Sequence, residues 1–142
     1  MGTLSKAAVA TAFLSLFAAP ALAGDVAAYP TRPLLDTEKT IIGETITYPT
    51  SGPARVKAAI VTIAPNTDTV FHRHGVPMFA YILKGTTVVD YGDKGLKTYK
   101  PGDAFVEAMA TTHRGTNPGS EPVEILVVYM GAEGAENVVP MK

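Results

Sequence analysis

The 142-residue chain contains no cysteine. Disulfides, zinc sites with cysteine ligands and thiol nucleophiles are therefore excluded. Its 12 basic and 13 acidic residues nearly balance, and the absence of any Lys/Arg-rich run argues against nucleic acid as a partner. Histidine is scarce, with three in the whole chain, so the position of each one carries information.

The rest of the composition is that of a folded protein. Hydrophobic residues make up 46% of the chain, enough to bury a proper core. The length suits one domain and is too short for two ordinary ones.

The first 23 residues resemble a signal peptide. Lys6 is the only charge before the apolar run of residues 7–19, and Pro20-Ala21-Leu22-Ala23 ends in the small-x-small pattern of a cleavage site. The alternative is an uncleaved membrane anchor, but the run is short for a span. We therefore expect cleavage after Ala23 and a secreted or periplasmic protein with no membrane association after cleavage.

From residue 41 onward the sequence is typical of β-structure. Short runs rich in Val, Ile and Thr alternate with turns of Gly, Pro, Asn and Asp, and no segment keeps a 3.6-residue period. This predicts an all-β sandwich or barrel over residues 41–131, preceded by an extended arm (24–40) and followed by an irregular tail (132–142). Residues 86–91 are predicted to pair with 78–83 as a hairpin.

Two of the three histidines lie close together in one predicted strand. Because alternate residues of a strand share a face, His72 and His74 should present their imidazoles side by side, with Arg73 pointing away. His113 is distant in sequence and must be brought to them by the fold. Arg114 follows it and is likewise expected to face away from any site.

The residues around the pair match most of a longer pattern: Gly, five residues, His-x-His, three or four residues, Glu, six residues, Gly. His72, His74 and Gly85 match it. Met78 stands where the pattern has Glu. Asn66 replaces the first Gly, a mild change because Asn also tolerates a positive φ.

A second pattern follows at the expected distance: Gly, five residues, Pro-x-Gly, two residues, His, three residues, Asn. Gly102, His113 and Asn117 match it, while Ala108 and Ala110 replace the Pro and the Gly. In both patterns the chain resembles the cupin superfamily. The resemblance implies a jelly-roll β-barrel, also called a double-stranded β-helix, but no single activity, because cupins include enzymes of several classes, sensors and storage proteins.

The resemblance also implies a metal site. In metal-binding cupins the corresponding residues, here His72, His74 and His113, hold one divalent transition metal ion, which could be Fe, Mn, Ni, Cu or Zn. The Glu ligand of the family is missing because Met78 replaces it. Sites with three histidines and no carboxylate occur within the superfamily among thiol and diketone dioxygenases.

Two residues could compensate for the missing carboxylate. Met78 could bind a soft metal through its thioether, or it could be an apolar core filler, which we favour. Glu107 interrupts an apolar strand, a costly position unless the carboxylate is paired or bound to metal. It could be a ligand, a catalytic acid or base, or a residue that orients a histidine; the alternative is a surface glutamate at a strand end.

The sequence thus predicts an exported metal-dependent oxidoreductase of the dioxygenase type, with Glu107 as its catalytic residue and a small molecule as substrate. The alternatives are a metal-assisted lyase or isomerase, and a barrel that binds or senses a small molecule or metal without catalysis. Cupins commonly dimerise through edge strands, so residues 25–39 could join two copies in a homodimer.

Overall fold

The computed structural model describes residue 2 and residues 29–141. The predicted signal peptide, apart from residue 2, and residues 24–28 of the predicted arm lie outside this range. Contacts divide the chain into one unit that ends at Arg32 and a second that begins at Pro33, and the second is described below. None of the helical structure in the described residues is long and apolar enough to cross a membrane.

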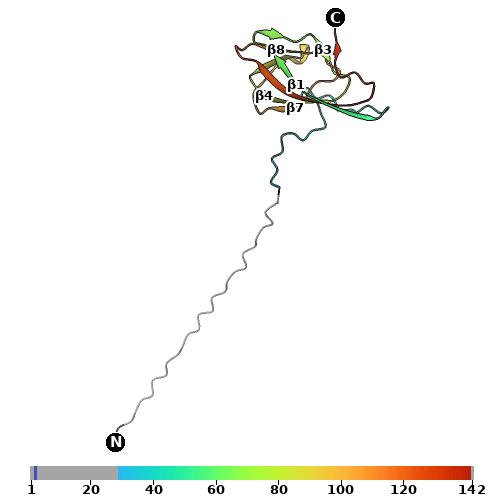
Figure 1. The fold of residues 1–142 in the computed structure, drawn as a ribbon. Coiled ribbons are helices and arrows are strands. Elements are labelled where there is room, and N and C mark those ends of the chain that lie inside the picture. The colour runs from blue at the N-terminus through green and yellow to red at the C-terminus, as the bar shows by residue number, and fades with distance from the viewer. Residues whose placement is uncertain (1, 3–28, 142) are drawn as a thin grey trace. The chain divides into compact units, whose positions relative to one another are not determined.

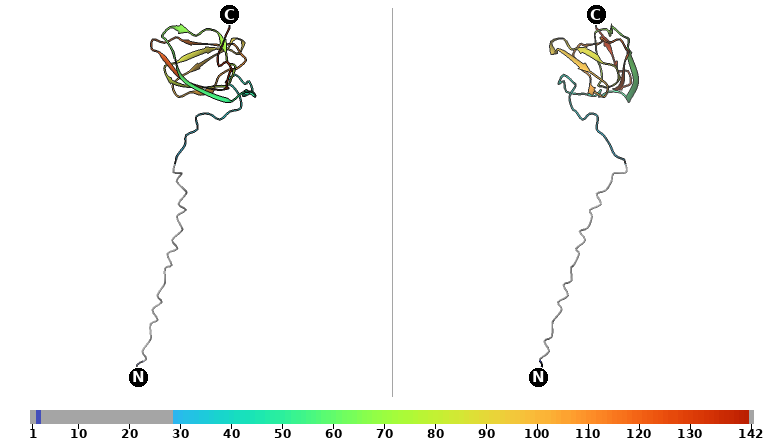
Figure 2. Two further views of the ribbon diagram at one scale, coloured as in Figure 1. Left: turned by 45° about the vertical axis from the view of Figure 1, so that its right-hand side comes forward. Right: turned by 90° about the vertical axis from the view of Figure 1, so that its left-hand side faces the viewer.

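The second unit consists of antiparallel strands arranged in three sheets (Figures 1 and 2). The first four-stranded sheet has the order β1 (Ala54–Ile63), β9 (Val123–Ala132), β4 (Met78–Lys84) and β7 (Ala104–Val106). The second has the order β2 (Thr67–Asp68), β8 (Arg114–Asn117), β5 (Thr87–Asp90) and β6 (Leu96–Tyr99). A two-stranded sheet pairs β10 (Val139–Pro140) with β3 (His72–Arg73), and a short 3-10 helix, η1 (Gly92–Lys94), joins β5 to β6.

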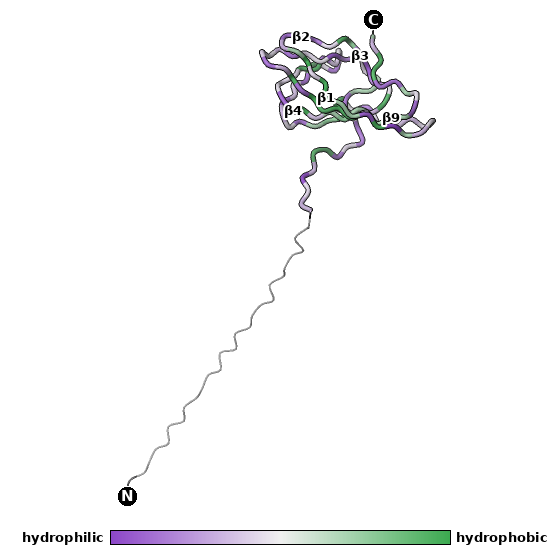
Figure 3. Tube along the Cα trace, viewed as in Figure 1, coloured by the Kyte–Doolittle hydropathy of each residue, from purple (hydrophilic) through white to green (hydrophobic). Residues whose placement is uncertain are grey.

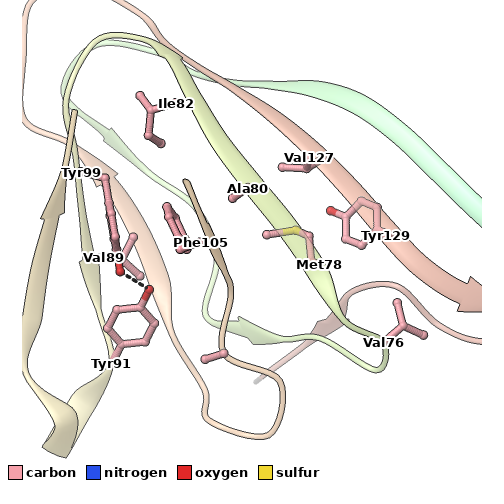
Figure 4. Close-up of a cluster of buried hydrophobic side chains, with 11 residues drawn as sticks. Val76, Met78, Ala80, Ile82, Val89, Tyr91, Tyr99, Phe105, Val127 and Tyr129 are labelled. Carbon is pink, nitrogen blue, oxygen red and sulfur yellow. Dashed lines mark hydrogen bonds between the residues drawn. The ribbon is translucent and has the colours of Figure 1, made fainter. Parts of the chain in front are cut away.

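The core lies between the two four-stranded sheets. Along β4 the buried residues alternate, with Met78, Ala80 and Ile82 on the inner face. Figure 4 shows them beside Val127 and Tyr129 of β9. β5, β6 and β7 contribute Val89, Tyr99 and Phe105 to the cluster, and Tyr91 follows β5. The predicted all-β class is confirmed; within the described residues the strands are hydrogen-bonded as three sheets, and their closure into a jelly-roll barrel stays a prediction.

The predicted hairpin of residues 78–83 with 86–91 is wrong. β4 pairs with β9 and β7, and β5 pairs with β6 and β8, so the two segments belong to different sheets. Gly85 makes the change of sheet possible, because its φ is 76° and a Cβ there would lie 2.9 Å from the carbonyl oxygen of Pro122. Alternation predicts that a segment is a strand and which face it buries, but it does not name its partner.

The C-terminal residues are more ordered than the predicted irregular tail. β9 continues to Ala132, and β10 pairs with β3, with Val139 opposite Arg73 and Pro140 opposite His72. β3 is hydrophilic, in contrast to the largely hydrophobic β1 (Figure 3). The sequence predicted a strand at His72, but the pairing of β3 with β10 depends on contacts distant in sequence.

Candidate metal centre

The backbone brings the three histidines together. His72 and His113 form an isolated antiparallel bridge, in which the N–H of each donates to the carbonyl of the other at 2.9 and 2.8 Å. The N–H of His74 donates to the carbonyl of Met109, in the loop before His113. The imidazole centroids lie 4.6–5.2 Å apart, and one ring nitrogen from each lies within 4.8 Å of the others. The predicted convergence is present.

Each imidazole is fixed by a hydrogen bond at the nitrogen nearer the backbone. The Nδ1 atoms of His72, His74 and His113 face the carbonyl oxygens of Val70, Asn137 and Thr111 at 2.8, 2.9 and 2.8 Å. A carbonyl only accepts, so Nδ1 carries the proton and Nε2 carries the lone pair. This is the arrangement in which histidine binds metal through Nε2.

Two of these Nε2 atoms are buried without a partner among the described residues, those of His74 and His113. A buried polar atom without a hydrogen bond is costly, so it calls for a group that the protein itself does not provide. Burial is also the main cause that lowers the pKa of all three imidazoles, in the case of His74 to about 4. At neutral pH they are therefore uncharged, and three neutral nitrogen donors fit a divalent transition metal ion.

Glu107 is part of the same cluster. It follows β7, is 5% exposed, and its Oε2 lies 4.0 Å from Nε2 of His113. Its Oε1 accepts hydrogen bonds from the hydroxyl of Tyr91 and the N–H of Ala108, both at 2.7 Å. Burial raises the pKa of Glu107 to about 7. The alternative of a surface glutamate is therefore wrong.

Glu107 lies beside the residue that replaced the expected carboxylate. Its N–H donates to the carbonyl of Met78 at 2.9 Å, next to the pair formed by Phe79 and Val106. A buried carboxylate thus lies beside β4, the strand on which the family pattern places its Glu, while the possible metal ligands among the described residues are the three histidines. Met78 itself is 7% exposed and belongs to the hydrophobic core, as expected for a filler.

Two tyrosines hold this carboxylate, and sequence reasoning missed both. Since Tyr91 donates its proton to Glu107, the hydroxyl of Tyr99, 2.9 Å away, donates to Tyr91 (Figure 4). Burial raises the pKa of both hydroxyls, so they remain protonated donors. Nothing in the spacing of these residues signals the contact, because it joins β6 and the end of β5 to the end of β7.

We expect Tyr91→Phe to destabilise the protein by about 1–3 kcal/mol, because it removes a donor from a buried carboxylate at nearly constant volume. Urea unfolding of the metal-free protein measures the change. Tyr48→Phe is the matched control, since Tyr48 is 60% exposed and should lose almost nothing. Equal stability of the two variants would contradict this role of Tyr91.

A third unpredicted residue, Glu44, fixes the loop before His113. Its carboxylate accepts hydrogen bonds from the N–H groups of Met109 and Thr111, at 2.6 and 2.9 Å, and from the hydroxyl of Thr111. Burial alone would raise the pKa of Glu44, but these hydrogen bonds outweigh it and the pKa is lowered. Because the carbonyl of Thr111 orients His113, Glu44 supports the cluster from outside.

The histidines and Glu107 line one end of a cavity of about 90 Å³ between the two sheets. Most of the remaining lining is apolar, from Val61 on β1 to Val127 on β9. Arg114 faces away, as predicted: it pairs with Asp68 at 3.2 Å and lies over the ring of Phe71. Arg73 is exposed and does not line the cavity.

Comparison with known proteins relates this site to a family. A family model described as "Cupin domain" matches residues 59–129. The polyketide cyclase RemF from Streptomyces resistomycificus is 20% identical, with a TM-score of 0.54 over 70% of this chain and 69% of that one. An oxalate decarboxylase from Lactobacillus farciminis is 23% identical, with a TM-score of 0.52 over 61% of this chain and 26% of that one.

The chain thus corresponds to only part of the decarboxylase, and identities this low show a shared fold alone. A search of curated protein sequences finds no match.

Proposed function

Because the chain belongs to the cupin family, we propose that it is a metal-dependent oxidoreductase of the dioxygenase type that acts on a small molecule. The observation that carries the proposal is the set of three neutral imidazoles, each held at Nδ1 by a carbonyl so that Nε2 is free. His72, His74 and His113 would hold one divalent ion, of Fe, Mn, Ni, Cu or Zn. Bound there, a redox-active ion supplies open coordination positions for substrate and O₂.

The protein's own residues prepare the site for this chemistry. The carbonyl contacts fix the imidazole planes before the ion arrives, which lowers the cost of assembling the ligands. Glu107, with Oε1 held by Tyr91 and Ala108, directs Oε2 toward His113 and the cavity. There it could take or return a substrate proton. The apolar walls exclude water from the reacting end.

Oxygen uptake tests the proposal. Protein loaded anaerobically with Fe(II) is given an uncharged thiol probe, ethanethiol, or a diketone probe, acetylacetone, and O₂ consumption is recorded. We expect O₂ to be consumed only when both iron and one of the probes are present. The rate of O₂ consumption should fall in the Glu107→Gln variant. Zinc-loaded protein is the control and should consume none. An iron-loaded protein that binds probes without consuming O₂ would contradict the dioxygenase assignment.

A second candidate is a metal-assisted lyase or isomerase. Glu107 favours it, because a buried carboxylate 4.0 Å from a ligand histidine suits proton transfer without a change of oxidation state. Conversion of a probe by the zinc-loaded protein without O₂ would favour this candidate. Binding of a probe without any conversion would favour the non-catalytic barrel.

Export belongs to the proposal as well. If residues 1–23 are a signal peptide, the mature protein begins at Gly24. We expect the intact mass of the protein recovered from periplasm or medium to match residues 24–142. A mass that includes Met1 would contradict export by this route.

Two further predictions stay open to test: closure of the two sheets into a jelly-roll barrel, and a homodimer formed through residues 25–39.

A further inference from the structure

The polar groups of the cavity gather at one end. His72, His74 and His113 lie there, with Oε2 of Glu107 4.0 Å from His113. Tyr129 is also at this end, its ring centroid 5.8 Å from that of His74. A substrate group that binds metal and hydrogen-bonds to the protein can therefore meet all its partners at one place.

The rest of the cavity offers few polar partners. Two threonines line it, but the hydroxyl of Thr87 donates to the carbonyl of Thr116, and that of Thr69 accepts from the N–H of Gly115. The other walls are mostly apolar side chains of both sheets, among them Val61, Ile63, Ala80, Val89, Phe105 and Val127. A second polar group on a substrate would be buried here without a hydrogen-bond partner, at a cost.

No lysine or arginine is among the described residues that line the cavity. A second anionic group on a substrate would lie against apolar walls, and Glu107 is the one acidic side chain among the described residues that line the cavity. A cationic group away from the metal end would be equally unpaired. Burial of an unpaired charge is far more costly than burial of a neutral polar group. The lining therefore discriminates against substrates with a second anionic group or with a cationic group.

The cavity is also small. Its volume of about 90 Å³ is less than the ~150 Å³ of a protein cavity known to take benzene. Gly115 forms part of the wall, and a Cβ there would lie 3.3 Å from Cδ1 of Ile63. The space beyond the metal end therefore suits a few carbon atoms and not an aromatic ring.

Resting on the proposed function, we propose that the substrate has a single metal-binding polar head and a short, uncharged, apolar body. The polar end of the cavity takes the head, and the apolar walls enclose the body. Dicarboxylates, amino acids and sugars do not meet this description, because each carries further polar or charged groups into the apolar part.

Four carboxylates of similar size test the proposal, since they share a carboxylate and differ in the far group: butyrate, 3-hydroxypropionate, β-alanine and malonate. Malonate and β-alanine can bind zinc through both groups, so each measured affinity is first divided by the affinity of that compound for free zinc ion, and these ratios are compared. Each is titrated by calorimetry into zinc-loaded protein, the zinc content being measured first. We expect butyrate to bind at least ~10-fold more tightly than the other three. Malonate or β-alanine binding as tightly as butyrate, or no binding of butyrate at all, overturns the substrate class. A protein that holds no zinc overturns the proposed function and this inference with it.

A change in the wall gives an independent check. Gly115→Ala narrows the apolar part, so butyrate should bind several-fold more weakly while formate, which has only the head, binds unchanged. Ile125→Val widens the cavity and should favour pentanoate over butyrate relative to the unaltered protein. If Gly115→Ala leaves the ratio of butyrate to formate affinity unchanged, and Ile125→Val leaves the ratio of pentanoate to butyrate affinity unchanged, the bodies do not bind in this cavity and the proposal fails.

Discussion

Replacing His113 with alanine is expected to lower the affinity for a divalent transition metal by more than ~100-fold. The side chain is 1% exposed, and its Nε2 is one of the two buried nitrogens without a partner among the described residues. Two imidazoles alone leave an incomplete site, and the vacated space lies next to Glu107. Competition with a chromogenic chelator measures the change in affinity.

Arg73→Ala is the matched control. Arg73 lies between His72 and His74 in sequence but is exposed and contributes nothing to the cavity. Its replacement should leave metal affinity within about twofold of the unaltered protein, as expected for an exposed residue. Equal affinities in the Arg73→Ala and His113→Ala proteins would show that the ion binds elsewhere.

Glu44→Ala is expected to destabilise the protein by about 2–3 kcal/mol and to weaken metal binding as well. The substitution removes the acceptor of two backbone N–H groups and one hydroxyl in the loop of Met109 and Thr111. That loop carries the carbonyl that fixes Nδ1 of His113, so the change reaches the site without touching a ligand. Urea unfolding and chelator competition give the two readouts.

The control here is Glu38→Ala, an exposed carboxylate in the segment before Glu44. It should change neither readout. If Glu44→Ala lowered stability but left metal affinity intact, the loop would be held by other contacts and the positioning role of Glu44 would be refuted.

The sequence predicted the parts of the site that local rules govern. Alternation predicted that the imidazoles of His72 and His74 lie together, and the family pattern predicted His113 beside them. The three rings do meet, although β3 ends at Arg73 and His74 follows it. The cost of burying a carboxylate singled out Glu107 within an apolar strand. Asn66 stands at the first glycine of the family's first pattern, and it has the positive φ of 54° that the resemblance implied.

The rest depends on contacts between distant segments. The tyrosines that hold Glu107 and the carboxylate of Glu44 act across strands or loops, and periodicity carries no information about such pairs. The same holds for β10, which pairs with β3 and positions the carbonyl of Asn137 against His74. The wrong hairpin between residues 78–83 and 86–91 has the same cause, because Gly85 turns the chain from one sheet to the other.

The central claim is that three imidazoles form one metal site. The most direct test is the metal content of the untagged protein, measured by mass spectrometry after incubation with Fe, Mn, Ni, Cu or Zn and removal of the free ion. The proposed site predicts about one ion per chain for at least one of these metals, with a rise in thermal stability on binding. Retention of none of the five would contradict it.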